Sequence, residues 1–187
     1  MTETAVEIPG YIAGTWTVDP VHSEVSFVVR HMMVSKVRGR FDKFSGTVTT
    51  AADPLQSAVT AIVDMSSVNT GAPDRDNHIR SADFFEVESH PTMTFRSTGV
   101  REDGDHFLLD GDLTIRGTTK PVTLKLEVNG FGPDAYGGTR AGFSATGEIN
   151  RHDFGVSYNG PIPGGGVAVS EKVTINIEAE GVLSSGE

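Results

Sequence analysis

The sequence predicts a single all-β domain, because apolar and polar residues alternate along most of the chain. The alternation is clearest in one C-terminal stretch, whose apolar positions are Val173, Ile175, Ile177 and Ala179. The 22 glycines and 9 prolines interrupt the chain often, as short strands and tight turns require. With 187 residues, the chain has the length of one domain with its own hydrophobic core.

The same alternation predicts further strands in chain order, roughly eight in all. Their apolar positions are Val25, Phe27 and Val29; Val59, Ala61 and Val63; Met93 and Phe95; Phe107, Leu109, Leu113 and Ile115; Val122, Leu124, Leu126 and Val128; and Phe143, Ala145 and Ile149. Another strand-like stretch covers Arg38–Thr50. Its two phenylalanines, Phe41 and Phe44, are out of phase, so we expect a bulge near Lys43 that turns both inward.

Two stretches break the alternation and predict short helical caps. His31–Val37 is expected to form a short helix over one end, and Ala72–Phe85 has helix-like charge spacing. Each predicted strand needs one face buried away from water. Either a sandwich of two sheets or a closed barrel would provide this.

The predicted inward faces mix large and small side chains. Phenylalanines such as Phe27, Phe95 and Phe143 share these faces with Ala61, Gly111, Ala145, Gly147 and Ala179. Such a mixture suits a tapered, filled core and an open channel equally well, so the pattern leaves both interiors open.

The charge balance excludes several classes of partner. A net charge of −10 disfavours nucleic-acid binding and attachment to anionic membranes through a polybasic patch. The absence of cysteine excludes disulfides and thiol chemistry. The N-terminal stretch has neither the basic region nor the apolar run of a signal peptide, and no segment approaches the ~20 apolar residues of a membrane helix. We therefore expect a cytoplasmic protein without stable membrane insertion.

The histidines do not show a metal-binding pattern. None of the six lies in an HExxH or similarly tight spacing, so we predict no metal site. Convergence of His22, His31 and His78 in space would overturn this prediction, since catalytic zinc needs three protein ligands. The glycine run at 164–166 lacks the lysine of a phosphate-binding loop and is interpreted as a flexible connection.

The densest polar cluster surrounds Asp76. As a catalytic site, Asp76 would orient His78 as a general base, but nearby side chains on one helical turn do not face each other. No GxSxG or cysteine nucleophile accompanies them. We therefore predict no catalytic residues, and an Arg75–Asp76 ion pair that holds the loop.

A set of short motifs follows in order: TWTVDPVHS from Thr15, GRF from Gly39, SVNT from Ser67, RDNHIRS from Arg75, HPTMTF from His90, GDLTIRG from Gly111 and RHDFG from Arg151. In this order the chain resembles the YceI-like family of polyisoprenoid-binding proteins over about Thr15 to Gly181. Two departures are Ile79, where the family usually has leucine, and the missing signal peptide. We assign residues 1–14 to an N-terminal extension, 15–182 to the domain and 183–187 to a C-terminal tail.

The resemblance implies an extended, lipocalin-like antiparallel barrel of about eight strands around a long isoprenoid chain. Side chains expected to line this tunnel are Phe27, Phe41, Phe44, Phe84, Phe85, Met93, Phe95, Leu113, Ile115, Leu124, Phe143, Ile149 and Phe154. Polar side chains expected at its ends are His22, His31, Arg75, Asp76, His78 and Arg151.

The function expected from this resemblance is binding, storage or carriage of a polyisoprenoid lipid or isoprenoid quinone, without catalysis. No cofactor other than this lipid is expected, and a homodimer is compatible with the resemblance. Two alternatives stay open. One is an enzyme or metal-dependent protein acting on a hydrophobic substrate through Arg75, Asp76 and His78. The other is an interaction module with a filled barrel.

Overall fold

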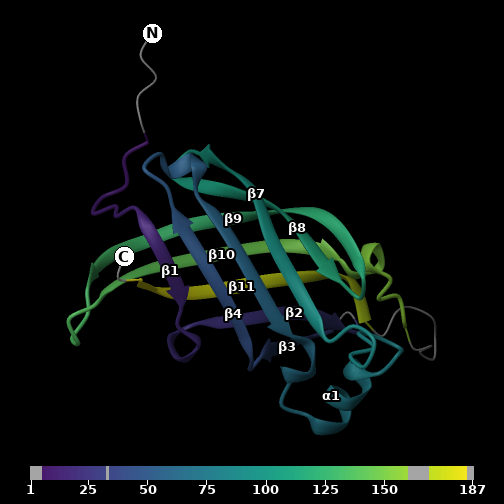
Figure 1. Ribbon diagram of the computed structural model, residues 1–187. Helices are drawn as coiled ribbons and strands as arrows, with labels where there is room; N and C mark the ends of the chain where they lie inside the picture. The colour runs from purple at the N-terminus through teal and green to yellow at the C-terminus, as the bar shows by residue number, and fades with distance from the viewer. Residues whose placement is uncertain (1–5, 33, 160–168, 185–187) are drawn as a thin grey trace.

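Eight strands close into an antiparallel barrel in the computed structural model, which describes residues 6–32, 34–159 and 169–184 (Figure 1). In order around the ring, the strands are β1 (Gly14–Val18), β4 (Phe44–Thr50), β5 (Ala58–Asp64), β7 (Thr92–Asp103), β8 (His106–Ile115), β9 (Thr118–Pro133), β10 (Thr139–Asn150) and β11 (Val169–Leu183). Strand β1 closes the ring on β11 by pairing Trp16 with Leu183. The predicted all-β barrel is confirmed, and the sandwich is excluded.

Three further strands extend the sheet past the ring: β2 (Glu24–His31), β3 (Ser35–Phe41) and β6 (Val68–Asn69). Each is joined to a ring strand across a short interruption. Strand β2 follows β1 after η1 (Pro20–His22), β3 precedes β4 with residues 42–43 between them, and β6 follows β5 after η3 (Met65–Ser67). The last two interruptions lie side by side, because the Asp42 amide donates to the Ser67 carbonyl at 3.1 Å. Instead of the bulge expected near Lys43, a break at residues 42–43 separates β3 from β4, and both Phe41 and Phe44 pack in the core as expected.

The prediction of a helix at His31–Val37 is wrong. Strands β2 and β3 form a hairpin there, with Arg30 opposite Lys36 and Val29 opposite Val37. Val29 and Val37 both line the interior, so burying this apolar pair favours strand pairing over a helix. At the turn, Met32 adopts a left-handed conformation with φ of 51°.

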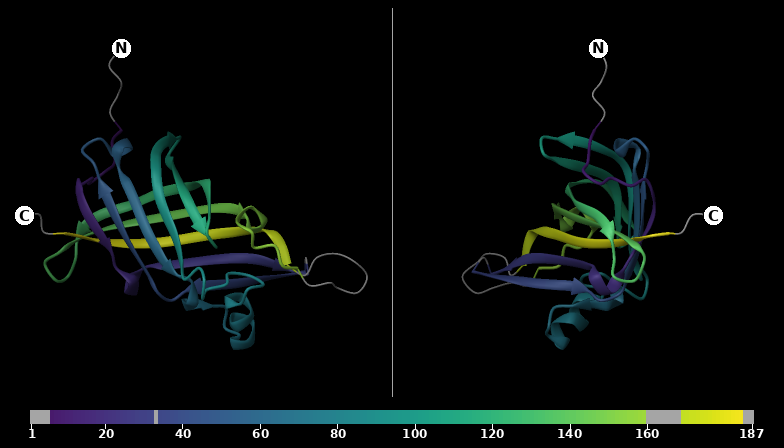
Figure 2. Two further views of the ribbon diagram at one scale, coloured as in Figure 1. Left: turned by 45° about the vertical axis from the view of Figure 1, so that its right-hand side comes forward. Right: turned by 90° about the vertical axis from the view of Figure 1, so that its left-hand side faces the viewer.

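One α-helix, α1 (Pro73–Arg80), lies outside the ring near the hairpin (Figure 2). It begins with proline and carries two aspartates in its first turn, both favourable at a helix N-terminus. The helical cap expected within Ala72–Phe85 is confirmed, and short 3-10 helices η2 (Pro54–Gln56) and η4 (Arg151–Phe154) follow strands elsewhere. Within the described residues, no helix is long and apolar enough to cross a membrane. The glycine run at 164–166 lies outside those residues.

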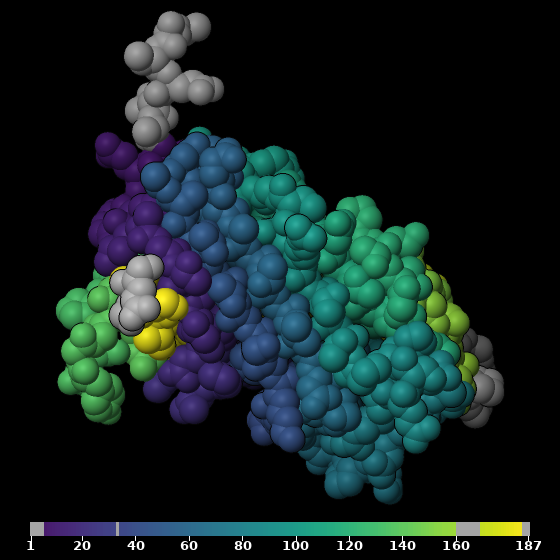
Figure 3. All heavy atoms as spheres, viewed as in Figure 1, coloured from purple at the N-terminus to yellow at the C-terminus, as the bar shows by residue number. Residues whose placement is uncertain are grey.

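Two clusters of buried side chains hold the barrel together. The larger contains Phe41, Met65 and Phe154, and the smaller is centred on Trp16, which is fully buried. The Trp16 indole donates to Thr50 Oγ1 at 2.8 Å, so its polar atom is satisfied inside the core. Figure 3 shows β1, β4, β5 and β7 packed side by side across one face of the molecule.

Candidate ligand-binding cavities

The barrel interior contains two cavities, which we call the first chamber and the second chamber. Their volumes are about 170 Å³ and about 340 Å³. Both walls include Val25, Met93 and Ile175, so the chambers are neighbours along the interior. Strand alternation places apolar side chains of the ring on both walls. The interior is therefore hollow rather than filled.

The first chamber is lined mainly by apolar side chains, with a few serine and threonine residues and Glu178 among them. Of the predicted tunnel residues, it receives Phe44, Met93, Phe95, Leu113, Leu124 and Phe143. The N-terminal stretch before β1 contributes Ile8 and Tyr11 to the same wall. Rings of Tyr11, Trp16 and Phe143 each contact Phe131 in edge-on geometry, with centroids 5.4–6.2 Å apart. This aromatic cluster packs tightly beside the first chamber.

Two glycines explain how large aromatic residues can leave the interior open. A Cβ atom at Gly111 would lie 2.3 Å from the Phe95 ring, and one at Gly39 would lie 2.3 Å from the Phe27 ring. Each ring therefore lies flat over a glycine on the neighbouring strand instead of pointing at the barrel axis. The mixture of large and small residues in the sequence thus lets the rings line the interior instead of filling it.

The second chamber lies between the β2–β3 hairpin, α1 and the loop after η4. It receives the predicted tunnel residues Phe27, Phe41, Phe84, Phe85, Met93, Ile115 and Ile149. Phe154 lines neither chamber, because η4 turns its side chain into the core, where it is 2% exposed.

Four of the predicted polar residues border the second chamber: His31, Arg75, His78 and Arg151. His22 and Asp76 do not line either chamber, contrary to the prediction. His22 is held with Asp19 at η1 on the barrel exterior, and Asp76 faces Thr70 beneath α1. Arginine and histidine side chains therefore border the second chamber, whereas none of them lines the first.

His78 belongs to a cluster of three rings at this polar end. Its imidazole, the Phe84 ring and the Tyr158 ring contact one another edge-on, with centroids 5.1–5.3 Å apart. The His78 Nε2 atom lies 2.8 Å from an Asp83 carboxylate oxygen. Such a cluster offers a ligand an aromatic surface beside a group that can carry a proton.

Asp76 and Arg75 stabilise the loop before α1, but not as the predicted ion pair. Asp76 accepts hydrogen bonds from the Thr70 amide at 2.8 Å and the Thr70 hydroxyl at 2.6 Å. Arg75 donates to the same hydroxyl oxygen at 2.7 Å and to the Thr70 carbonyl at 2.9 Å. Both side chains therefore meet at Thr70. Since Asp76 contacts Thr70 rather than His78, the pair lacks the geometry of an orienting acid and a general base.

Arg151 closes one wall of the second chamber from within the core. It is 5% exposed, and its guanidinium donates to the carbonyl groups of Val156, Tyr158, Val169 and Ser170 at 2.8–3.2 Å. Burial lowers the pKa of Arg151 from its ordinary value. These bonds tie the segment after η4 to the start of β11, so Arg151 positions the wall rather than meeting a ligand with a free charge.

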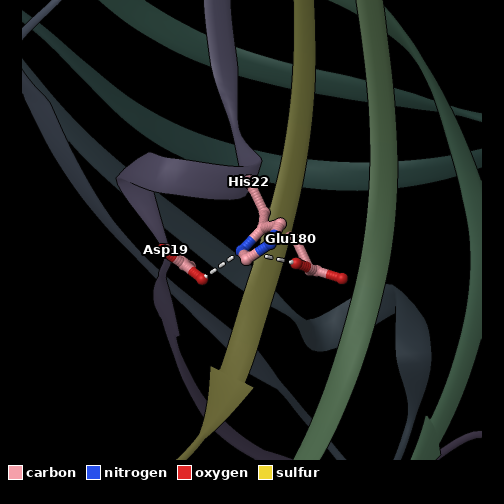
Figure 4. A group of neighbouring side chains, drawn as sticks. All are labelled: Asp19, His22 and Glu180. Carbon is pink, nitrogen blue, oxygen red and sulfur yellow. Dashed lines mark hydrogen bonds and ion pairs between the residues drawn. The ribbon is translucent and has the colours of Figure 1, made fainter. Parts of the chain in front are cut away.

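A separate polar cluster lies on the outside of the barrel, where η1 meets β11 (Figure 4). The His22 Nδ1 atom lies 2.7 Å from an Asp19 oxygen and 3.5 Å from a Glu180 oxygen. Among the described residues, these three form the one group with metal-ligand spacing. Arg140 contacts the same two carboxylates at 2.8 and 3.1 Å, so a guanidinium already balances their charge.

The hydrogen bond from Arg140, followed by that with His22, holds the pKa of Asp19 well below its ordinary value. Arg140 also contacts Asp134 at 3.0 Å, in the turn between β9 and β10. The cluster is therefore an ion-pair network that joins η1, β10 and β11 at one end of the barrel.

Several lining residues were not among the predicted site residues. Ile175 and Ile177 were in phase with the alternation, so the sequence contained a signal for them. Tyr11 and Tyr158 lie outside the strands, where no periodicity marks an inward position. Their place in the site depends on how the N-terminal stretch and the loop after η4 fold back.

Comparisons with known proteins agree with this architecture. The chain matches the YceI-like domain over residues 16–181. Protein YceI of Escherichia coli O157:H7 is 40% identical over 163 residues, which cover 86% of this chain and 82% of the relative.

Solved structures show the same fold. BcnA of Burkholderia cenocepacia superposes with a TM-score of 0.75 at 26% identity, covering 87% of this chain and 98% of BcnA. A polyisoprenoid binding domain from Saccharophagus degradans, implicated in plant cell wall breakdown, superposes with a TM-score of 0.68 at 17% identity, covering 92% and 100%. That last likeness is one of fold alone. With the match over residues 16–181 and the identity to the Escherichia coli protein, the chain belongs to the YceI-like domain family.

Proposed function

We propose that this protein binds one long isoprenoid chain, as a polyisoprenoid lipid or an isoprenoid quinone, and stores or carries it without catalysis. The observation that supports this most is the asymmetry of the interior, in which two mainly apolar chambers adjoin and arginine and histidine side chains border only the second. A flexible hydrocarbon with one polar head group has the same asymmetry. The Saccharophagus degradans domain, described as polyisoprenoid binding, has the same fold.

The physical basis is burial of hydrocarbon in a dry interior. Each methylene transferred from water contributes about 0.8 kcal/mol, so a few isoprene units stabilise a complex before ordering costs are subtracted. In this arrangement the chain runs towards the first chamber, and its head group lies near His31, Arg75 and His78. Of the predicted polar ends, these three side chains are exposed as well as adjacent to the chamber.

Organic extraction of the purified protein, followed by mass spectrometry, tests the proposal. We expect a stoichiometric isoprenoid compound, and its identity will separate a quinone from a polyprenyl lipid. A matched pair of variants on β5 sharpens the test, because Ala61 lines the first chamber whereas Ala58 is exposed. Ala61→Phe should lose most of the bound lipid and Ala58→Phe should retain it. Equal loss, or solvent alone from the wild type, would contradict the proposal.

The enzyme alternative makes a different prediction for α1. If His78 acted in turnover, His78→Ala would bind the lipid but stop converting it. We propose that this variant alters only affinity, since Asp76 is engaged with Thr70. Incubation with the extracted lipid, followed by product analysis, tests this directly. A cytoplasmic location and a homodimer stay predictions, to be tested by cell fractionation and by sedimentation velocity.

A further inference from the structure

A row of basic side chains lies on the outer face of the β2–β3 hairpin. Lys36, Arg38 and Arg40 occupy alternate positions of β3, and all three are exposed. Arg30 lies opposite Lys36 on β2, and Lys172 of β11 borders the same groove. The whole chain has only 15 basic residues and a net charge of −10, whereas positive charge predominates on this part of the surface.

Most of this charge has no ion-pair partner among the described residues. In the part of the chain that the structure describes, ion pairing involves Arg40, which contacts Asp42 at 2.9 Å, but none of the other four. Two acidic residues, Glu148 and Glu171, also border the groove, and the cations outnumber them. We call Arg30, Lys36, Arg38 and Lys172 the basic face.

The hairpin turn beside the basic face presents apolar side chains to solvent. Met32 is 44% exposed and Val34 is 85% exposed. Met32 also has the left-handed backbone that asparagine or glycine adopts with less strain. The tight turn accounts for this conformation, but the exposure of two apolar side chains does not stabilise the fold and calls for another explanation.

This surface adjoins the second chamber. Arg30 and His31 line the chamber, and both lie within three residues of the exposed apolar turn. Figure 2 shows the hairpin, the start of β11 and α1 gathered towards one end of the molecule.

We propose that the basic face and the apolar turn dock this protein on an anionic lipid bilayer. Lysine and arginine attract anionic head groups, and short apolar side chains between them enter the head-group region. A nucleic acid or an acidic protein would be attracted by the charge, but exposed methionine and valine add nothing to contact with phosphates. Docking is peripheral and reversible. It does not depend on what the chambers hold, although its use in lipid exchange rests on the proposed function.

Flotation with vesicles tests docking directly. The wild type should bind vesicles of phosphatidylcholine and phosphatidylglycerol but not phosphatidylcholine alone, and salt should release it. The double variant Lys36→Glu/Arg38→Glu should bind at least about 25-fold more weakly, since each basic residue near an anionic surface contributes about fivefold. Lys120→Glu/Lys125→Glu on β9 changes the net charge equally and should bind like the wild type.

A second variant separates membrane docking from binding to any polyanion. Met32→Ser/Val34→Ser should weaken vesicle binding while leaving retention on heparin unchanged. Docking is overturned if the wild type does not float with anionic vesicles, if both charge-reversed variants lose binding equally, or if the serine variant floats like the wild type. Lipid extraction from the same samples keeps the two proposals distinguishable. Flotation that depends on the basic face, with no extractable lipid, would retain docking and contradict lipid storage.

Discussion

The two chambers differ in how their surroundings are held together. Beside the first chamber, Trp16, Phe131 and Phe143 pack closely, and Trp16 is fully buried. Around the second, a hairpin, one helix and a loop join ring strands in forming the wall, and the guanidinium of Arg151 ties the loop to β11. Apolar packing contributes at both ends, and hydrogen bonds from a buried guanidinium to backbone carbonyl groups add to it at the second.

The two chambers suit different parts of a lipid. The mainly apolar first chamber can hold hydrocarbon, but it offers no arginine, lysine or histidine side chain to a head group. The second chamber also receives a hairpin, a helix and a loop, which carry cationic and imidazole side chains. We therefore expect changes at the second chamber to alter head-group binding, whereas the loss of a buried ring or a buried hydrogen bond should lower stability at either end.

The largest effect is expected at Trp16. Trp16→Ala removes a fully buried ring and leaves Thr50 without its indole donor, so it should lower the unfolding free energy by about 3–5 kcal/mol. Urea unfolding followed by circular dichroism measures this change. Tyr136→Ala is the control, because Tyr136 is 90% exposed and its loss should change little. A small effect at Trp16 would show that its burial and its hydrogen bond to Thr50 contribute little to stability.

Arg151 should have the next largest effect. Arg151→Met keeps much of the buried volume but leaves several backbone carbonyl groups without a donor, which should reduce stability by about 2–3 kcal/mol. Bound lipid should also dissociate faster, because the wall of the second chamber loosens. Arg101→Met, which breaks an exposed pair with Asp110, should change stability by less than about 1 kcal/mol. Equal effects of the two variants would contradict the proposal that Arg151 holds the wall of the second chamber in place.

A smaller effect is expected from a single methyl group in the first chamber. Gly111→Ala pushes the Phe95 ring off the wall, so it should cost about 1–3 kcal/mol and reduce the lipid recovered on extraction. Gly99→Ala on β7 meets open space and should do neither. Full lipid binding by Gly111→Ala would mean that the flat position of Phe95 does not keep the chamber open.

The smallest effect concerns the ion pairs around Arg140. The pKa of Asp19 is lowered in the folded protein. Its carboxylate therefore contributes to folding stability above the unfolded pKa of about 3.9, and this contribution disappears as pH falls. Wild type should therefore exceed Asp19→Asn in stability at pH 7, and the gap should narrow below about pH 4. Thermal unfolding across this range measures it, with Glu102→Gln as an exposed control. A gap that does not depend on pH would rule out an electrostatic origin.

Much of the fold was predictable because strand alternation is a local property. It identified the inward faces of β5, β9, β10 and β11, and the phase shift between Phe41 and Phe44 correctly located an interruption. It failed at His31–Val37, where the pairing of Val29 with Val37 across the hairpin outweighed local preference. The ordered motifs also identified the family, which the match over residues 16–181 confirms.

The candidate site was less predictable, because side chains that are distant in the chain decide it. Twelve of the predicted tunnel residues line a chamber, whereas Phe154 turns into the core with η4. Asp76 was predicted to form an ion pair with Arg75, but both side chains form hydrogen bonds with Thr70 instead. Net charge was equally uninformative about the basic face, since it averages over a surface on which like charges are segregated.

The sequence by itself determined that each strand has one dry face and that the chain belongs to one family of barrels. Only the tertiary structure decided that the barrel is hollow. A filled core and an open one require the same alternation, and the difference lies in where each ring points. Phe95 lies flat over Gly111, and Phe27 lies flat over Gly39, on strands that meet only after folding. The space inside therefore depends on contacts between strands, which no local pattern records.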